Sequence, residues 1–359
     1  MDANLAKPLS TTILGAGLMG RLLALALARA GHAVQVFEAG GPDAEGAAAR
    51  VAAAMLAPLA ESAITEPQVV QMGQYSLQRW PQLIAQLDAP VFFQQNGTLI
   101  LWHRQDAAEA TRFGHQLSAT RQQLPSLPAP QALDAAGIAA LEPAIANRFA
   151  QGLYLPGEGQ LDNRQLLAAL LLQLQKHQVG LHWHSPRQPE DCQADWVIDC
   201  RGLGAQAQWP GLRAVRGEVL RLHAPDVELQ RPVRLVHPRY PLYIAPKPGN
   251  VFVVGATEIE SDDMSPMSVR SSLELLSAAY SVHPGFGEAR ILESATQCRP
   301  TLPNNLPAIR RPSPRVLQIN GLYRHGFLIA LAMLDAVLEL IEKEHSALAT
   351  QWELAIETV

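Results

Sequence analysis

The feature that most restricts the fold of this chain is a glycine-rich turn near its beginning. Residues 11–14 are β-branched or apolar and predict a strand, and Gly15-Ala16-Gly17-Leu18-Met19-Gly20 follows directly. Helix formers fill residues 21–29, and a second apolar run at residues 33–38 predicts a parallel strand. This order of strand, tight turn, helix and strand is typical of an α/β domain that binds a dinucleotide.

The glycines of this turn have separate predicted roles. Gly15 allows the tight turn, Gly17 lets the backbone approach a pyrophosphate, and Gly20 lets the helix pack closely on the strand. The N-terminus of the helix supplies amide donors for the phosphates. Glu38 lies 18 residues after Gly20, near the roughly 20 expected for an acid that binds a ribose 2′-hydroxyl. The alternative is a glycine turn of another α/β protein with a solvated Glu38.

The middle of the chain carries turn signals. Asn96-Gly97 between apolar runs predicts a β-hairpin over residues 92–101, because a type I′ turn requires positive φ at both central residues. Residues 106–143 predict helices broken by a proline loop and contain no strand pattern. Asp162 precedes a leucine-rich helix and is predicted to cap it.

The charge balance excludes some partners. The chain has 359 residues and a formal charge of -5, which argues against a large basic surface for nucleic acid or anionic lipid. A local basic cluster, Arg231, Arg234, His237 and Arg239, lacks interleaved aromatic residues, and we interpret it as a solvated edge or a subunit contact. A small-molecule partner is therefore expected, and a homo-oligomer stays open.

The cysteines indicate a reducing compartment. Cys192, Cys200 and Cys298 form neither a CxxC pair nor a dense disulfide pattern, so no structural metal site is expected. The apolar run at residues 327–341 contains Asp335 and is shorter than the roughly 20 residues of a membrane span. We therefore expect a cytoplasmic protein without a transmembrane segment.

The glycine turn alone leaves FAD and NAD open, although a nicotinamide dehydrogenase would usually continue with further βα units. Additional motifs are Ala54-Met55-Leu56-Ala57-Pro58, Leu141-Glu142-Pro143, Gly255-Ala256-Thr257, Arg299-Pro300 with Asn305-Leu306-Pro307, and Asn320-Gly321-Leu322-Tyr323-Arg324-His325-Gly326-Phe327. In this order they resemble the D-amino-acid oxidase superfamily of FAD enzymes, most closely its glycine oxidase branch, which is associated with thiamine biosynthesis. The resemblance covers nearly the whole chain.

The resemblance implies non-covalently bound FAD. Its predicted contacts are Gly15, Gly17, Leu18, Met19, Gly20, Glu38, Ala54, Met55, Gly202, Arg324, His325, Gly326 and Phe327. The helix that begins at Gly326 would place its N-terminus near the pyrimidine carbonyl of the flavin. Related sarcosine oxidases link the flavin through a cysteine, but we expect Cys298 to be a buried packing residue. The resemblance also predicts a glycine where Ala54 stands and a small polar residue where Arg50 and Val51 stand.

The resemblance further predicts the substrate contacts. Arg299 is the expected main partner of a substrate carboxylate, because a guanidinium grips a carboxylate through two parallel hydrogen bonds. Tyr243 is expected to donate its hydroxyl to the same carboxylate, with Tyr240 as a competitor, and Arg324 to assist. These three, Arg299, Tyr243 and Arg324, are the predicted catalytic residues. His325 is expected to lie behind the reacting atoms.

The implied reaction is oxidative deamination of a small amino acid or amine such as glycine, sarcosine or a D-amino acid. Hydride transfer to flavin N5 would give an imine and then a 2-oxo acid and ammonia, with molecular oxygen as acceptor and hydrogen peroxide as product. One alternative is a flavin dehydrogenase that uses another acceptor. A second is a flavoprotein that acts on a partner polypeptide or RNA.

The expected architecture is α/β. An FAD-binding Rossmann-like domain, residues 1–65, 150–215 and 300–359, is interleaved with an α+β substrate domain, residues 66–149 and 216–299. Short apolar runs between proline and glycine turns predict an antiparallel sheet in the second domain, with strands at residues 217–222, 242–246 and 251–255.

Overall fold

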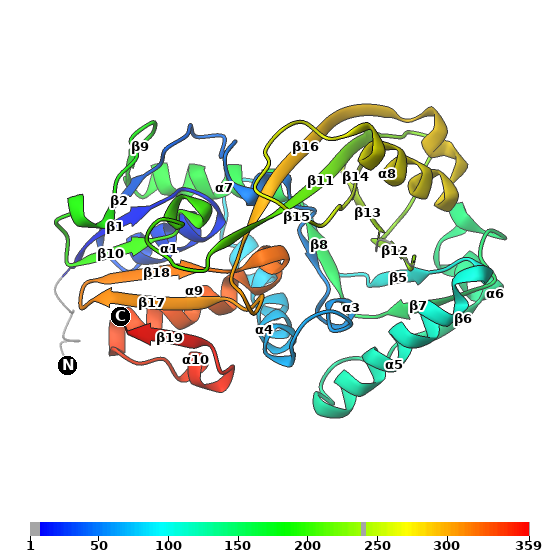
Figure 1. Cartoon of the computed structure of the whole chain (residues 1–359), viewed down its shortest axis with the longest axis horizontal. Helices are drawn as coiled ribbons and strands as arrows, with labels where there is room; N and C mark the ends of the chain where they lie inside the picture. The colour runs from blue at the N-terminus through cyan, green and yellow to red at the C-terminus, as the bar shows by residue number, and fades with distance from the viewer. Residues whose placement is uncertain (1–7, 238–241, 359) are drawn as a thin grey trace.

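The structure is a computed structural model, and it describes residues 8–237 and 242–358. Two large sheets stand beside each other, with helices packed around them (Figure 1). One sheet has seven strands and the other nine, and a small three-stranded sheet completes the fold. The predicted α/β class is confirmed.

The seven-stranded sheet contains the predicted βαβ unit. Its order is β19 (Ala355–Thr358), β17 (Ala308–Ser313), β18 (Val316–Asn320), β10 (Trp196–Asp199), β1 (Ser10–Leu14), β2 (Ala33–Phe37) and β9 (Gly180–His182). Strand β1 runs parallel to both β2 and β10, whereas β17 and β18 are antiparallel. A parallel pair with helices on it is typical of a nucleotide-binding domain.

Helix α1 (Leu18–Arg29) connects β1 to β2 and lies very close to the turn before it. A Cβ atom on Gly20 would stand 1.8 Å from the carbonyl oxygen of Gly15, so only glycine permits this approach. Helices α7 (Asn163–Lys176) and α9 (Gly326–Lys343) pack against α1 around one apolar core. Asp162 caps α7 as predicted, because its side chain accepts hydrogen bonds from two backbone amides of the first turn.

The nine-stranded sheet is mostly antiparallel. Its strands are β15 (Ile259–Glu260), β11 (Arg213–His223), β14 (Val251–Gly255), β13 (Leu242–Lys247), β12 (Val233–Leu235), β5 (Thr98–Leu101), β7 (Gln151–Leu155) and β6 (Gln131–Asp134), and β16 (Arg290–Thr301) pairs with β11. The strands predicted at 217–222, 242–246 and 251–255 are confirmed within β11, β13 and β14. Strand β7 falls between residues 150 and 215 although it belongs to this sheet. The domain boundaries stay a prediction.

The predicted hairpin over residues 92–101 is wrong. Strand β4 (Phe93–Gln94) pairs with β8 (Gly159–Leu161) in the three-stranded sheet, which also contains β3 (Met55–Leu56), whereas β5 pairs with β12 and β7. Gly97 has a φ of 83° and its amide donates to the carbonyl of Glu158, but Asn96 has no positive φ. The dipeptide therefore connects two sheets instead of closing one hairpin.

The remaining helices are α2 (Ala48–Val51), α3 (Pro58–Glu61), α4 (Pro67–Ile84), α5 (Ala107–Gln123), α6 (Ala135–Leu141), α8 (Val269–Val282) and α10 (Ala347–Gln351). The sequence pattern missed β6, because this edge strand is mostly exposed and has no apolar alternation. In the part of the chain that the structure describes, no helix combines the length and apolar character needed to cross a membrane.

Candidate active site

The predicted site residues gather around one large cavity. It has a volume of about 1090 Å³ and is lined by residues of both large sheets. Pockets for drug-sized ligands have roughly 300–1,000 Å³, so this cavity has room for a larger molecule such as a dinucleotide. Every predicted contact residue lines it except Gly20, which packs against the turn instead.

The glycine turn forms one end of the cavity. Gly15 has a φ of 91°, and a Cβ atom there would stand 2.8 Å from the carbonyl oxygen of Cys200. Around Gly17, by contrast, the nearest atom to an added Cβ is the Cβ of Ala47 at 3.6 Å. Gly17 also precedes α1 without a capping side chain, and Leu18 and Met19 line the cavity. The backbone here is open to a phosphate group.

Glu38 lies beside this turn and holds its backbone. One carboxylate oxygen accepts from the amide of Ala16 at 2.6 Å and the other from the amide of Gly40 at 2.8 Å. Gly202, with a φ of 57°, lines the cavity at the beginning of a 3-10 helix, η4 (Gly202–Ala205). The binding of a ribose hydroxyl by Glu38 stays a prediction.

The alanine-rich segment forms a central wall of the cavity. It is not one continuous helix, because α2 ends at Val51 and a stretch without regular secondary structure follows before β3. Ala54 in this stretch is buried and has a φ of 53°, a left-handed conformation that favours glycine. This explains why a glycine is expected at this position. Arg50 donates to the carbonyl of Asp43, whereas Val51 and Met55 line the cavity.

The segment before α9 forms the wall at the other end. A 3-10 helix, η6 (Tyr323–His325), leads into Gly326, the first residue of α9, and these residues with Phe327 line the cavity. His325 is buried, and its Nδ1 lies 3.3 Å from Glu61 Oε2. Burial holds the pKa of His325 well below its ordinary value, so its imidazole is neutral.

Arg299 stands in the cavity wall without an acidic partner. Its guanidinium donates to the carbonyls of Arg216 at 3.3 Å and Thr257 at 3.2 Å, and no carboxylate of the described ranges forms an ion pair with it. Gly217 provides the space, because a Cβ there would stand 2.3 Å from Arg299 Nη2. Burial raises the pKa of Tyr243, so this cavity-lining phenol is a neutral donor.

Arg324 differs from Arg299 because it is paired with two carboxylates. Its Nε lies 3.2 Å from Glu61 Oε2, and its Nη1 lies 2.9 Å from Glu258 Oε2. Glu258 also accepts a hydrogen bond from the hydroxyl of Tyr323 at 2.6 Å. Burial, and then this bond to Glu258, raises the pKa of Tyr323 to about 12.

The interpretation of the basic cluster as a solvated edge is wrong for Arg231 and Arg234. Both are buried; Arg231 pairs with Glu142 at 2.7 Å, and Arg234 forms a close ion pair with Glu61. The sequence could not reveal the second pair, because its members are 173 positions apart. Arg239 and Tyr240, the competitor of Tyr243, lie outside the described residues.

Cys298 is buried as predicted, with its Sγ 3.6 Å from the carbonyl of Ser261. Burial raises the pKa of its thiol. All three cysteines are free. Within residues 8–237 and 242–358, no group of three or more His, Cys, Asp or Glu side chains could hold a metal ion.

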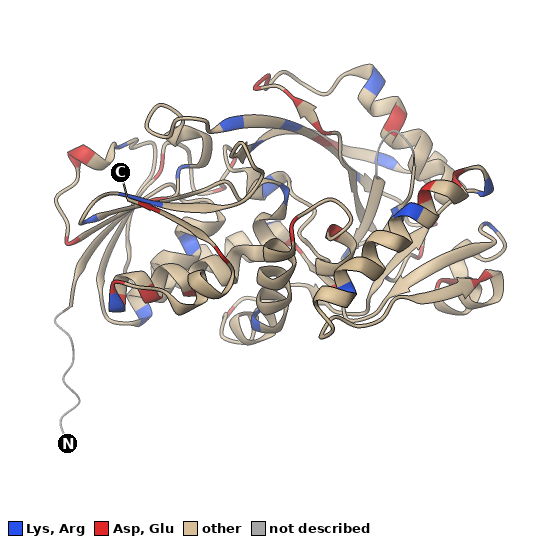
Figure 2. Cartoon of the chain, turned by 60° about the horizontal axis from the view of Figure 1, so that its bottom comes forward, with Lys and Arg blue, Asp and Glu red and all other residues tan. Residues whose placement is uncertain are grey.

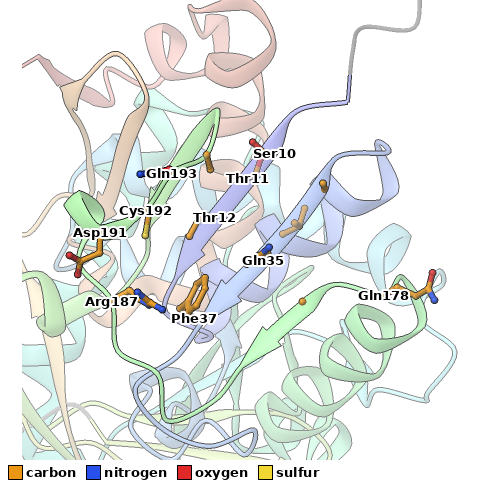
Figure 3. A pocket seen from close by; sticks show the side chains of 14 residues that line it. Ser10, Thr11, Thr12, Gln35, Phe37, Gln178, Arg187, Asp191, Cys192 and Gln193 are labelled. Carbon is orange, nitrogen blue, oxygen red and sulfur yellow. The ribbon is translucent and has the colours of Figure 1, made fainter.

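A second hollow of about 480 Å³ lies beside β1 and β2 (Figure 3). Phe37 and Arg187 line both hollows, and the Arg187 guanidinium carbon lies 5.2 Å from the centre of the Phe37 ring. None of the predicted site residues lines the smaller hollow. The large cavity is therefore the candidate active site.

The open backbone at Gly17, the ordered acid Glu38 and the beginning of α9 all line this cavity, and they fit the binding of a flavin dinucleotide. The family model for FAD dependent oxidoreductases matches residues 10–339. The chain belongs to this family of FAD-dependent enzymes.

Individual relatives agree with this assignment. A putative thiamine biosynthesis oxidoreductase from Rhizobium etli is 41% identical over 323 residues, which are 90% of this chain and 93% of the relative. The crystal structure of glycine oxidase from Geobacillus kaustophilus superposes with a TM-score of 0.81 at 25% identity, covering 95% of this chain and 96% of that chain. Iminodiacetate oxidase from Chelativorans sp. BNC1 has the same fold, with a TM-score of 0.81 at 20% identity over 97% and 100% of the chains.

Proposed function

We propose that the chain oxidises a small amino acid or amine that carries an α-carboxylate, with molecular oxygen as the electron acceptor. The observation that carries this proposal is Arg299, a cavity-lining guanidinium whose hydrogen-bond partners among the described residues are two backbone carbonyls. A carboxylate placed there would receive two parallel hydrogen bonds. Similarity to glycine oxidase and to a thiamine biosynthesis oxidoreductase supports the substrate class.

When bound, FAD supplies the acceptor for the two electrons that are released when the α-carbon–hydrogen bond of the substrate breaks. The residues of the chain position the substrate: Arg299 fixes its carboxylate, and the neutral phenol of Tyr243 donates a further hydrogen bond. The neutral imidazole of His325 faces Glu61, so we assign it no proton transfer. The substrate amine enters uncharged, and its lone pair supports formation of the imine.

The overall reaction balances with oxygen and water. An amino acid, one oxygen molecule and one water give a 2-oxo acid, ammonia and hydrogen peroxide. The positive charge of Arg299, which has no acidic partner among the residues that the structure describes, stabilises the anionic carboxylate during this reaction. In the view of Figure 2 basic and acidic residues are interspersed over the ribbon, which favours a small substrate over a nucleic acid.

The test is anaerobic addition of glycine, sarcosine or a small D-amino acid to the purified yellow protein. We expect the visible flavin absorbance to fade with at least one of them and peroxide to form when air returns. Arg299→Met should lower kcat/KM by about 10³-fold, roughly 4 kcal/mol of lost stabilisation. Arg299→Lys should recover part of it, because a lysine keeps the charge without the two parallel bonds. If no candidate amine bleaches the flavin, the proposed function is wrong.

The same protein distinguishes an oxidase from a dehydrogenase. After anaerobic reduction, the rate of flavin reoxidation by air is compared with the rate for an artificial electron acceptor such as a quinone. Faster reoxidation by air with stoichiometric peroxide supports the oxidase. Reoxidation by the quinone alone would replace oxygen with another acceptor and leave the substrate assignment intact.

A further inference from the structure

The substrate end of the cavity holds an unequal number of charges. Three arginines line it, Arg234, Arg299 and Arg324, together with two carboxylates, Glu61 and Glu258. Glu61 pairs with Arg234 and Arg324, and Glu258 pairs with Arg324. Only Arg299 of these three has no acidic partner among the residues that the structure describes.

Glu258 is held over this end from the nine-stranded sheet. It follows Thr257, whose amide donates to the carbonyl of Glu218 and whose hydroxyl lies 3.0 Å from a carboxylate oxygen of the same Glu218. The carbonyl of Thr257 also accepts from Arg299. The backbone that carries Glu258 is therefore held in place next to the Arg299 guanidinium.

The side chain of Glu258 contacts two residues of η6. Its two oxygens bind the Tyr323 hydroxyl at 2.6 Å and Arg324 Nη1 at 2.9 Å. The side chain of Glu258 is 49% exposed and that of Arg324 is 17% exposed, so the pair lies where the cavity meets solvent. Glu258 is thus already paired with Arg324, the cation that a second anionic group of a substrate would need.

We propose that Glu258 determines substrate charge by restricting the site to amines with a single carboxylate. This inference rests on the proposed function and deepens it. One carboxylate of the substrate binds Arg299. A second carboxylate would lie near Arg324, whose charge Glu258 already neutralises, and the negative charge of Glu258 would repel it. Iminodiacetate, which is glycine with a second carboxymethyl group on its nitrogen, is therefore a poor substrate compared with sarcosine.

The experiment compares kcat/KM for sarcosine and iminodiacetate by oxygen consumption of the holoenzyme. In the wild type we expect sarcosine to be preferred by at least about 10-fold. Glu258→Gln keeps the shape and removes the charge, so the preference should fall by about 10-fold. Both anions gain from the added positive charge, but the dianion gains more because its charge is doubled.

Two further variants make the result specific. Glu260→Gln is the matched control, because Glu260 is two positions away, pairs with Arg213 and does not line the cavity; its preference should equal that of the wild type. Glu258→Gln combined with Arg324→Gln should lose the gain for iminodiacetate, since the released guanidinium is then absent. An unchanged preference in Glu258→Gln, or a wild type that oxidises both compounds equally well, would overturn the proposal.

Binding without turnover separates this inference from the proposed function. Acetate and malonate are titrated into the holoenzyme, and their Kd values follow from the perturbation of the flavin absorbance. The wild type should favour acetate, and Glu258→Gln should tighten malonate about 10-fold more than acetate. If no amine is oxidised but this shift occurs, only the proposed function fails. If amines are oxidised and the shift is absent, only the role of Glu258 fails.

Discussion

The two ends of the cavity are built in different ways. The end at the Gly15–Gly20 turn is formed by main chain from one short segment, with Glu38 bound to the backbone amides of Ala16 and Gly40. The substrate end is formed by charged side chains from distant segments, such as Arg234 and Glu61, which are 173 positions apart. A site built from main chain requires glycines at fixed spacing, which can be recognised in the sequence. A site built from ion pairs between distant residues has no such local sequence pattern.

The largest expected effect tests the glycine end. Gly20→Ala places a Cβ 1.8 Å from the Gly15 carbonyl, against rigid backbone, so the helix must move away from its strand. We expect expression without bound FAD and a loss of several kcal/mol in the free energy of unfolding. Circular dichroism and flavin content measure both effects.

Gly17→Ala is the matched variant, because its Cβ meets nothing closer than 3.6 Å. The fold should persist, with an unchanged circular dichroism spectrum, while the Kd for FAD rises about 10-fold or more as the methyl group obstructs the phosphate. Equal loss of structure in both variants would show that the turn is purely structural. If both variants retained as much FAD as the wild type, the dinucleotide would not bind at this end of the cavity.

The next effect tests the substrate end. Gly217→Ala places a Cβ 2.3–2.5 Å from the guanidinium atoms of Arg299. These are the tip of a flexible side chain, so the guanidinium moves and the fold remains. We expect kcat/KM for glycine or sarcosine to fall by about 10–100-fold, and flavin content to stay the same. Gly114→Ala, on α5 where an added Cβ has no neighbour within 4 Å, is the control. Unchanged kinetics in Gly217→Ala would place the carboxylate elsewhere.

The same contrast explains how much could be predicted from the sequence. The βαβ unit, its turn and the antiparallel strands follow from local patterns, the burial of Cys298 follows from the resemblance to the glycine oxidase branch, and all are confirmed. The hairpin at Asn96-Gly97 fails because the amide of Gly97 bonds to Glu158, in a distant strand connection. A local turn rule has no knowledge of such a competing partner.

The substrate end was predictable only in part. The resemblance predicts Arg299 and Tyr243 as substrate contacts, and both line the cavity. The sequence does not predict Glu61 and Glu258 as site residues, because a single glutamate in a sequence is most often solvated. The basic cluster that contains Arg234 is interpreted as a solvated edge or a subunit contact because it lacks interleaved aromatic residues, whereas the ion pair with Glu61 makes the burial of Arg234 tolerable.

A smaller effect concerns Lys247, which supports the wall between the two ends. Its Nζ is buried and donates to the carbonyls of Ala53 at 2.8 Å and Leu161 at 2.7 Å. Burial lowers the pKa of Lys247 to about 7. In the unfolded chain a lysine has a pKa of about 10.4, so the unfolded state binds more protons between these values. Stability therefore rises with pH from about 7 to about 10.

The measurement is the free energy of unfolding in urea at several pH values across this window. The wild type should gain about 1 kcal/mol per pH unit relative to Lys247→Met, which lacks the titrating group. Lys343→Met is the control, because the Lys343 side chain is 52% exposed beside Glu339. Parallel pH profiles for wild type and Lys247→Met would mean that the ammonium keeps its proton inside the protein.

The smallest effect concerns Ala54, in the same wall. Its φ of 53° costs an L-residue about 1–2 kcal/mol, while glycine would lose about 0.5–1 kcal/mol more backbone entropy on folding. Ala54→Gly should therefore stabilise the protein by about 0.5–1 kcal/mol and raise Tm by about 1–2 °C. Ala53→Gly is the matched control: Ala53 is also buried but has no positive φ, so its replacement should lower Tm. If both substitutions lower Tm, packing of the methyl group outweighs the backbone conformation, and the main-chain logic of the glycine end does not extend to this wall.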